Sequence, residues 1–267
     1  MTTETESRKA PAQGPIAANP ASPTSAAPGP SAFSRLWRRV STRPDPLTGV
    51  ALTLPVFLAY HLGILVIPDR SDADAVSRLA FKMLDASVPA YITATFAIAL
   101  VVAVIVWVQQ KRGATPVWSI GRVVLESGAY ALLLLGTLGW ATYRLAPGIA
   151  VASPTSPPVL TKLVLACGAG FHEELVFHAL LVTGAAAALQ SLLKLPRPTA
   201  LGTTVLVSSL LFALAQYLGS YSDVTFDTFF YRALLGLAFA LLYLVRGFAV
   251  AVYSHVFYVA LVYFVYA

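Results

Sequence analysis

The sequence predicts an all-α, polytopic membrane helix bundle with about seven transmembrane helices. Hydrophobic residues make up 57% of the 267 residues and charged residues only 11%, whereas soluble domains average about 45–50% apolar. Several apolar runs reach the roughly 20 residues that an α-helix needs to cross a bilayer. The alternating pattern of a membrane β-barrel is absent, so helices are expected throughout the apolar part of the chain.

Seven spans are predicted along the chain, and the fourth differs from the others in length. It is too long for one upright helix and too short for two full spans, and Gly168 and Gly170 are candidates for a break or a tilt within it. A re-entrant segment at this point would invert the topology of everything downstream. The predicted spans cover residues 47–67, 89–109, 124–145, 160–192, 201–218, 229–245 and 248–266.

The amino-terminal part differs in composition from the rest. Residues 1–33 are rich in Ala, Pro, Ser and Thr and contain almost no large apolar side chains, so they cannot bury enough surface to fold. A basic, aromatic stretch over residues 33–43 then precedes the first span and suits an anionic cytoplasmic leaflet. We therefore expect a disordered tail over 1–46 and one transmembrane domain over 47–267.

The charge distribution predicts an orientation. The net charge of +6 comes from basic residues gathered beside the spans, which indicates membrane topology and not nucleic-acid binding. The positive-inside rule then places the amino terminus in the cytoplasm and the carboxyl terminus outside. The single cysteine, Cys167, excludes an intramolecular disulfide. The basic residues assigned to the inside are Lys111, Arg112, Arg122, Lys194, Arg197 and Arg246; the acidic residues assigned to outside loops are Asp69, Asp72, Asp74, Asp223 and Asp227.

Two adjacent glutamates interrupt the fourth span, in the segment FHEELVFH over residues 171–178. Ionisable residues at membrane depth are costly and usually mark chemistry or transport. On an α-helix, Glu174 and His178 lie one turn apart and Glu173 borders the same side, whereas His172 points away. Two close carboxylates in a low dielectric do not both ionise easily, which suits a general base. The alternative is an interhelical hydrogen-bond network without turnover.

Other polar residues in the apolar runs are weaker candidates by themselves. His255 lies inside the last span, Gln216 ends a run that contains Phe212, and His61 lies in the first span. A lone histidine in such a position is more often a packing residue. The segment is not a His-Glu-x-x-His zinc motif, because Val176 occupies the place of the second histidine.

Three segments together resemble the CPBP family, the membrane-embedded CAAX-prenyl-protease and bacteriocin-processing peptidases. The family's first motif, Glu-Glu-x-x-x-Arg, is similar to EELVFH over 173–178, and the second, Phe-x-x-x-His, to FALAQ over 212–216. The third, His-x-x-x-Asn, is similar to HVFYV over 255–259. The segments 230–236 and 242–247 resemble the family's connection between the last two motifs. The resemblance covers about residues 159–266.

The resemblance implies hydrolysis of a peptide bond in a membrane-associated peptide or protein by a glutamate-activated water. Glu173 would be the catalytic base, Glu174 its orienting partner, and His255 a metal ligand or water-positioning group. A divalent ion such as zinc is implied as a cofactor, with Glu173, His255 and an inward-turned His178 as its ligands. Phe212 and Gln216 would support the site.

Three positions depart from the family motifs. His178 stands in place of arginine, Gln216 in place of histidine, and Val259 in place of asparagine. An amide is a poor zinc ligand, and valine offers no donor to an oxyanion.

The sequence therefore favours a membrane metalloprotease or glutamic-type endopeptidase. A catalytically inactive relative that binds membrane peptides or assembles a complex is the first alternative, and a small transporter or proton relay is the second. The composition, rich in Ala, Pro and Arg, is typical of a bacterial protein, so we expect a multi-pass protein of the bacterial inner membrane.

Overall fold

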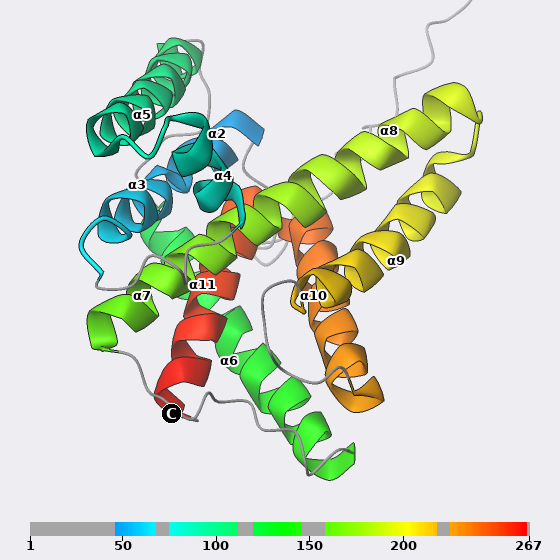
Figure 1. Ribbon diagram of the computed structural model, residues 1–267. Coiled ribbons are helices and arrows are strands. Elements are labelled where there is room, and N and C mark those ends of the chain that lie inside the picture. The colour runs from blue at the N-terminus through cyan, green and yellow to red at the C-terminus, as the bar shows by residue number, and fades with distance from the viewer. Residues whose placement is uncertain (1–45, 68–74, 112–119, 146–157, 218–224, 266–267) are drawn as a thin grey trace, which may run out of the picture. The chain divides into compact units, whose positions relative to one another are not determined.

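The computed structural model describes residues 46–67, 75–111, 120–145, 158–217 and 225–265, all within the compact unit Arg43–Ala267. This part of the chain is helical and contains seven helices long and apolar enough to cross a membrane, which confirms the predicted fold class. The predicted disordered tail and its basic stretch over 33–43 lie outside the described residues. The elements in chain order (Figure 1) are α2 (Pro46–Leu52), α3 (Leu54–Gly63), α4 (Ala75–Met83), α5 (Val88–Lys111), α6 (Ile120–Leu145), α7 (Val159–Gly168), η3 (Ala169–Val182), α8 (Thr183–Leu192), α9 (Arg197–Ala215), α10 (Phe226–Arg246) and α11 (Phe248–Val265).

The first span and its exit differ from the prediction. The span is split into α2 and α3 at Thr53, because Pro55 has no N–H to donate and its ring opposes a continuous helix. The Thr53 hydroxyl instead donates to the carbonyl of Val50 at 2.8 Å. The helix ends at Gly63, and the short helix α4, which the span prediction omitted, follows before α5.

The fourth span is one continuous helical stretch from Val159 to Leu192, so the described structure contains no re-entrant break there. Its centre, η3, is π-helical, with hydrogen bonds from residue i to i+5, and such segments are frequent at functional sites. The α-helical geometry expected for 171–178 is therefore wrong in detail. Gly168 and Gly170 do not interrupt the helix but lie where neighbouring segments approach it closely.

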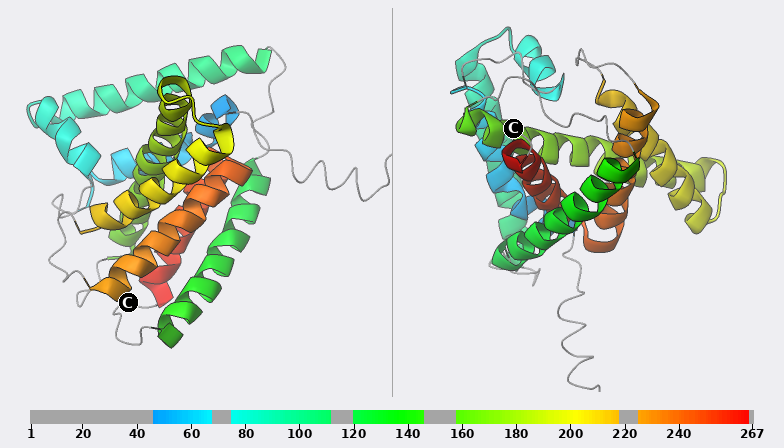
Figure 2. Two further views of the ribbon diagram at one scale, coloured as in Figure 1. Left: turned by 90° about the vertical axis from the view of Figure 1, so that its right-hand side faces the viewer. Right: turned by 90° about the horizontal axis from the view of Figure 1, so that it is seen from below.

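Helix α11 packs against α6, η3, α7, α10 and α2 and contributes most of the largest buried cluster, including Val250, Val252 and Val256. Figure 2 shows α9, α10 and α11 side by side, with α6 along the same group. A Cβ atom on Gly170 would lie 2.8 Å from the backbone nitrogen of Val256 and 3.0 Å from the carbonyl of Val252. The absence of a side chain at Gly170 thus allows η3 and α11 to touch.

We expect Gly170→Ala to destabilise the protein, because the added methyl group meets the α11 backbone, which cannot move without repacking the core. Overpacking of this kind typically costs about 1–3 kcal/mol. Gly184→Ala is the matched control, since a Cβ there meets nothing within 4 Å among the described residues. Thermal unfolding of the purified variants in one detergent measures both, and equal midpoints for the two variants would contradict the close contact.

Candidate functional site

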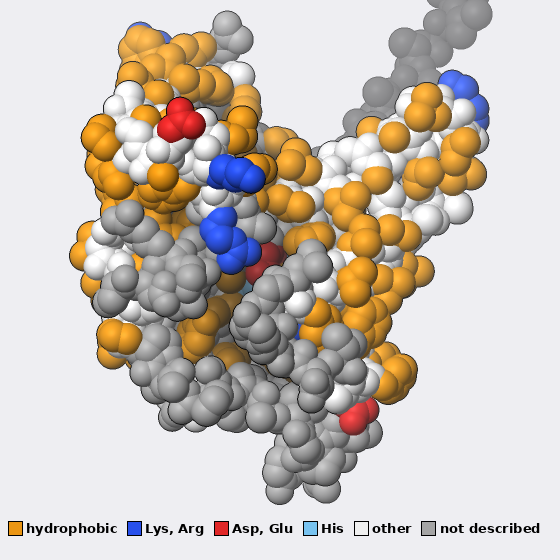
Figure 3. Space-filling model, viewed as in Figure 1, with side chains coloured by type: hydrophobic (Ala, Val, Ile, Leu, Met, Phe, Trp, Pro, Cys, Tyr) orange, Lys and Arg blue, Asp and Glu red, His pale blue; other side chains and the backbone are white. Residues whose placement is uncertain are grey.

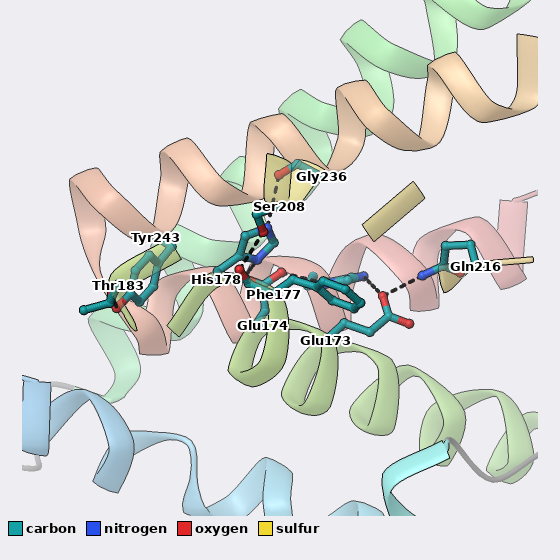
Figure 4. A network of polar contacts seen from close by, with 10 residues as sticks. Glu173, Glu174, Phe177, His178, Thr183, Ser208, Gln216, Gly236 and Tyr243 are labelled. Atoms are coloured by element: carbon teal, nitrogen blue, oxygen red, sulfur yellow. Dashed lines mark hydrogen bonds and ion pairs between the residues drawn. The ribbon is translucent and has the colours of Figure 1, made fainter. Parts of the chain in front are cut away.

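The two glutamates of η3 point to different surroundings (Figure 4). The side chain of Glu174 is fully buried, whereas that of Glu173 is 25% exposed. Neighbouring positions on a helix face different directions, so a doublet can place one carboxylate inside the bundle and the other at a surface. The two carboxylates therefore have different surroundings.

Glu174 is held by two buried histidines. Its Oε2 accepts a hydrogen bond from Nδ1 of His178 at 2.7 Å, and its Oε1 accepts one from Nδ1 of His255 at 2.8 Å. The other ring nitrogen of His178 donates to the carbonyl oxygen of Gly236 at 3.2 Å. This closed network joins η3, α10 and α11.

Glu173 lies on the open side of the same network. Its Oε2 accepts a hydrogen bond from Nε2 of Gln216 at 2.8 Å and lies 3.7 Å from Nε2 of His255. Because Nδ1 of His255 is directed at Glu174, the ring presents Nε2 to Glu173. Figure 3 shows an acidic side chain set back from the surface in the middle of the face viewed. The 25% exposure of Glu173 allows its carboxylate to contact water.

Aromatic rings frame the polar groups. Phe239 stacks on His255 with ring centroids 4.2 Å apart. Phe212 contacts both His178 and His255, at centroid distances of 6.1 and 6.0 Å. Phe212 reaches this place because Gly236 has no side chain: a Cβ there would lie 2.8 Å from its ring. The rings thus pack against the two histidines that hold the fully buried Glu174.

Some members of the site were not predicted. The hydroxyl of Ser208 on α9 donates to the carbonyl of Phe177 at 2.6 Å, which satisfies a backbone acceptor of η3 and joins the two helices. Gly236 and Phe239 complete the set. A polar serine within an apolar span was the signal available for Ser208, whereas the roles of the other two depend on packing alone.

The structure brings Glu173, Glu174, His178, Gln216 and His255 together, with Phe212 among them. His172 lies outside this cluster, as the helix construction predicted. Its ring instead contacts Tyr60 and His61, at centroid distances of 5.1 and 5.2 Å, and His61 bonds to Tyr91.

The donor set does not fit a zinc ion as it stands. Both ring nitrogens of His178 are engaged, one with Glu174 and one with the Gly236 carbonyl, so neither has a lone pair directed at a metal. That leaves Glu173 and Nε2 of His255, one ligand fewer than the three protein ligands of catalytic zinc sites. Among the described residues, no three His, Cys, Asp or Glu side chains are grouped to hold a metal ion.

We expect His178→Ala to destabilise the protein strongly, because it removes one of the two donors to the buried Glu174 carboxylate. Breaking a buried pair on one side typically costs about 3–5 kcal/mol. The double variant Glu174→Leu/His178→Leu removes the buried carboxylate together with His178. It leaves only a neutral ring nitrogen of His255 without its partner, so it should lose less stability than His178→Ala alone. Thermal unfolding in detergent measures both, and a double variant that is the less stable of the two would contradict this account.

The chain was compared with known proteins. No curated protein and no solved structure matches it. Residues 155–261, less than half of the chain, match the family model of the type II CAAX prenyl endopeptidases, Rce1-like. The matched region contains every residue of the Glu173–His255 cluster and agrees closely with the 159–266 core expected from the motifs. Residues 155–261 are thus similar to the Rce1-like domain, a match consistent with the CPBP intramembrane protease type that the motifs resemble.

Proposed function

We propose that this protein is an intramembrane peptidase in which Glu173 activates a water molecule to cleave a membrane-associated peptide or protein. The observation that carries the proposal is the division within the doublet: Glu174 is buried and doubly hydrogen-bonded, whereas Glu173 is a quarter exposed beside the Nε2 of His255. A general base must reach both a water and the substrate, and Glu173 meets that requirement.

The proposed reaction uses residues already in contact. Glu173 takes a proton from water as the water oxygen attacks the carbonyl carbon of the peptide bond. The carbon–nitrogen bond then breaks, and the leaving amine receives a proton from Glu173 or from Nε2 of His255. Glu174 holds His255 through Nδ1, so it orients the imidazole and stabilises its protonated form, the task of the carboxylate in a catalytic triad.

The departures from the family motifs lower the expected rate. Val259 offers no hydrogen bond to an oxyanion, and loss of one such donor typically costs about 10²–10³ in rate. Gln216 keeps a neutral donor on Glu173 where the family has a histidine. A catalytically inactive relative that binds membrane peptides is the second candidate, and these two substitutions are the observations that favour it.

The location proposed for the protein is the bacterial inner membrane, with the amino terminus in the cytoplasm. The basic residues beside the spans support this orientation. Val159–Leu192 is a single helix, so the chain crosses the membrane once there. Successive spans can then run in alternating directions, as the proposed orientation requires.

We expect Glu173→Gln to abolish cleavage while the protein stays folded, because glutamine retains the size and hydrogen bonding of the side chain but cannot accept the proton. Glu126→Gln is the matched control: Glu126 is the one glutamate outside the Glu173–Glu174 doublet in the described residues, and it pairs with Arg246 on a different part of the bundle. Quantitative proteomics of membranes from cells carrying each variant identifies peptide ends that require Glu173.

Three outcomes separate the candidates. Peptide ends lost only in Glu173→Gln support the peptidase. A Glu173→Gln variant that keeps the cellular role of the wild type, with no end lost, overturns the peptidase and supports the binding protein. Solute flux into vesicles that depends on pH and on Glu173 would instead support a transporter.

A further inference from the structure

Arg232 is a charged residue within a membrane span that the proposed reaction does not use. It lies in α10, inside the span Phe226–Arg246. Its guanidinium carbon is 4.3 Å from the ring centroid of Tyr217, a cation–π contact. Its Nη1 is buried and has no hydrogen-bond partner among the described residues. A guanidinium nitrogen that is buried without a hydrogen-bond partner is costly, so a binding role is the natural explanation.

The packing of α9 against α10 places Arg232 at the level of the site. The helices run antiparallel, and Phe212 of α9 meets Gly236 of α10. One turn along each helix from that contact lie Gln216 and Arg232, since residues four apart share a face. Gln216 is the residue that bonds to Glu173. Further along the same pair of segments, Tyr217 and Thr228 are joined by a hydrogen bond of 2.7 Å, which agrees with this antiparallel pairing.

The other donors at this level are already engaged. The Gln216 amide donates to Glu173, Nδ1 of His255 donates to Glu174, and His178 uses both of its nitrogens. The hydroxyls of Tyr231 and Tyr258 bond to each other. Among these donors, Arg232 retains one that is buried and unused.

We propose that Arg232 binds the carbonyl oxygen of the scissile peptide bond and the oxyanion that forms from it. This inference rests on the proposed peptidase function and assigns to α10 the donor that Val259 cannot provide from α11. A guanidinium keeps its charge and binds an oxygen anion more strongly than a neutral carbonyl. It would therefore stabilise the transition state more than the bound substrate, as catalysis requires.

The test measures binding, so that it does not depend on turnover. The probe is an acetylated Leu-Leu-Ala peptide in which a phosphinate replaces one peptide bond, as a mimic of the tetrahedral anion. Its partner is the same molecule with an uncharged ketomethylene group. Calorimetric titration of the purified protein in nanodiscs gives both dissociation constants for wild type, Arg232→Lys and Arg232→Gln. Arg122→Gln, an exposed arginine on α6, controls for net charge.

We expect wild type and Arg122→Gln to prefer the phosphinate, and Arg232→Gln to lose that preference by about 10²-fold, the order measured for single oxyanion donors. Arg232→Lys should retain part of it, and thermal unfolding without probe shows whether each variant is folded. A folded Arg232→Gln that keeps the preference overturns the inference, as does a wild type that has none. If the Arg232-dependent preference appears but no peptide end depends on Glu173, the anion site stands and the peptidase function fails.

Discussion

The burial of the Glu174 carboxylate is the constraint on which the rest of the site depends. A carboxylate taken out of water inside a membrane protein persists only when its oxygens are hydrogen-bonded. Here the two donors come from His178, one turn away, and from His255, 81 residues away. The second bond requires contact between η3 and α11, and Gly170 makes that contact sterically possible. One buried charge thus fixes the relative position of two helices.

The same bonds explain why a doublet is useful where a single glutamate would not suffice. Glu174 has the structural role, because it orients His255 and holds His178 against the α10 backbone. Glu173 is left with a neutral amide donor and the free edge of His255, so its oxygens stay accessible. A lone carboxylate would have to be both buried enough to hold the histidine and open enough to meet water.

The sequence predicted the parts of this arrangement that depend on local pattern. Seven spans follow from apolar runs, and the Glu174–His178 pair follows from a spacing of four that persists in the π-helical geometry of η3. Contacts between residues far apart in the sequence could not be predicted in this way. The carbonyl of Gly236 contacts His178 and the ring of Phe239 contacts His255 because of how the helices pack, and no sequence spacing identifies either residue. The break at Pro55 in the first span and the short helix α4 were not predicted.

The departures at residues 216 and 259 have a common physical consequence. Where the resembled motif has a histidine, Gln216 offers an amide, which is a poor metal ligand and gives a neutral hydrogen bond to Glu173. His178 is fully engaged elsewhere. The chemistry that these residues can support is then proton transfer between Glu173, water and His255, with no protein-bound metal required to position the groups. An oxygen anion formed in such a site still needs a charged or strong donor. Val259 cannot supply such a donor, so a residue of another span must. Arg232 of α10 lies at this level and has a buried guanidinium nitrogen, Nη1, without a hydrogen-bond partner among the described residues.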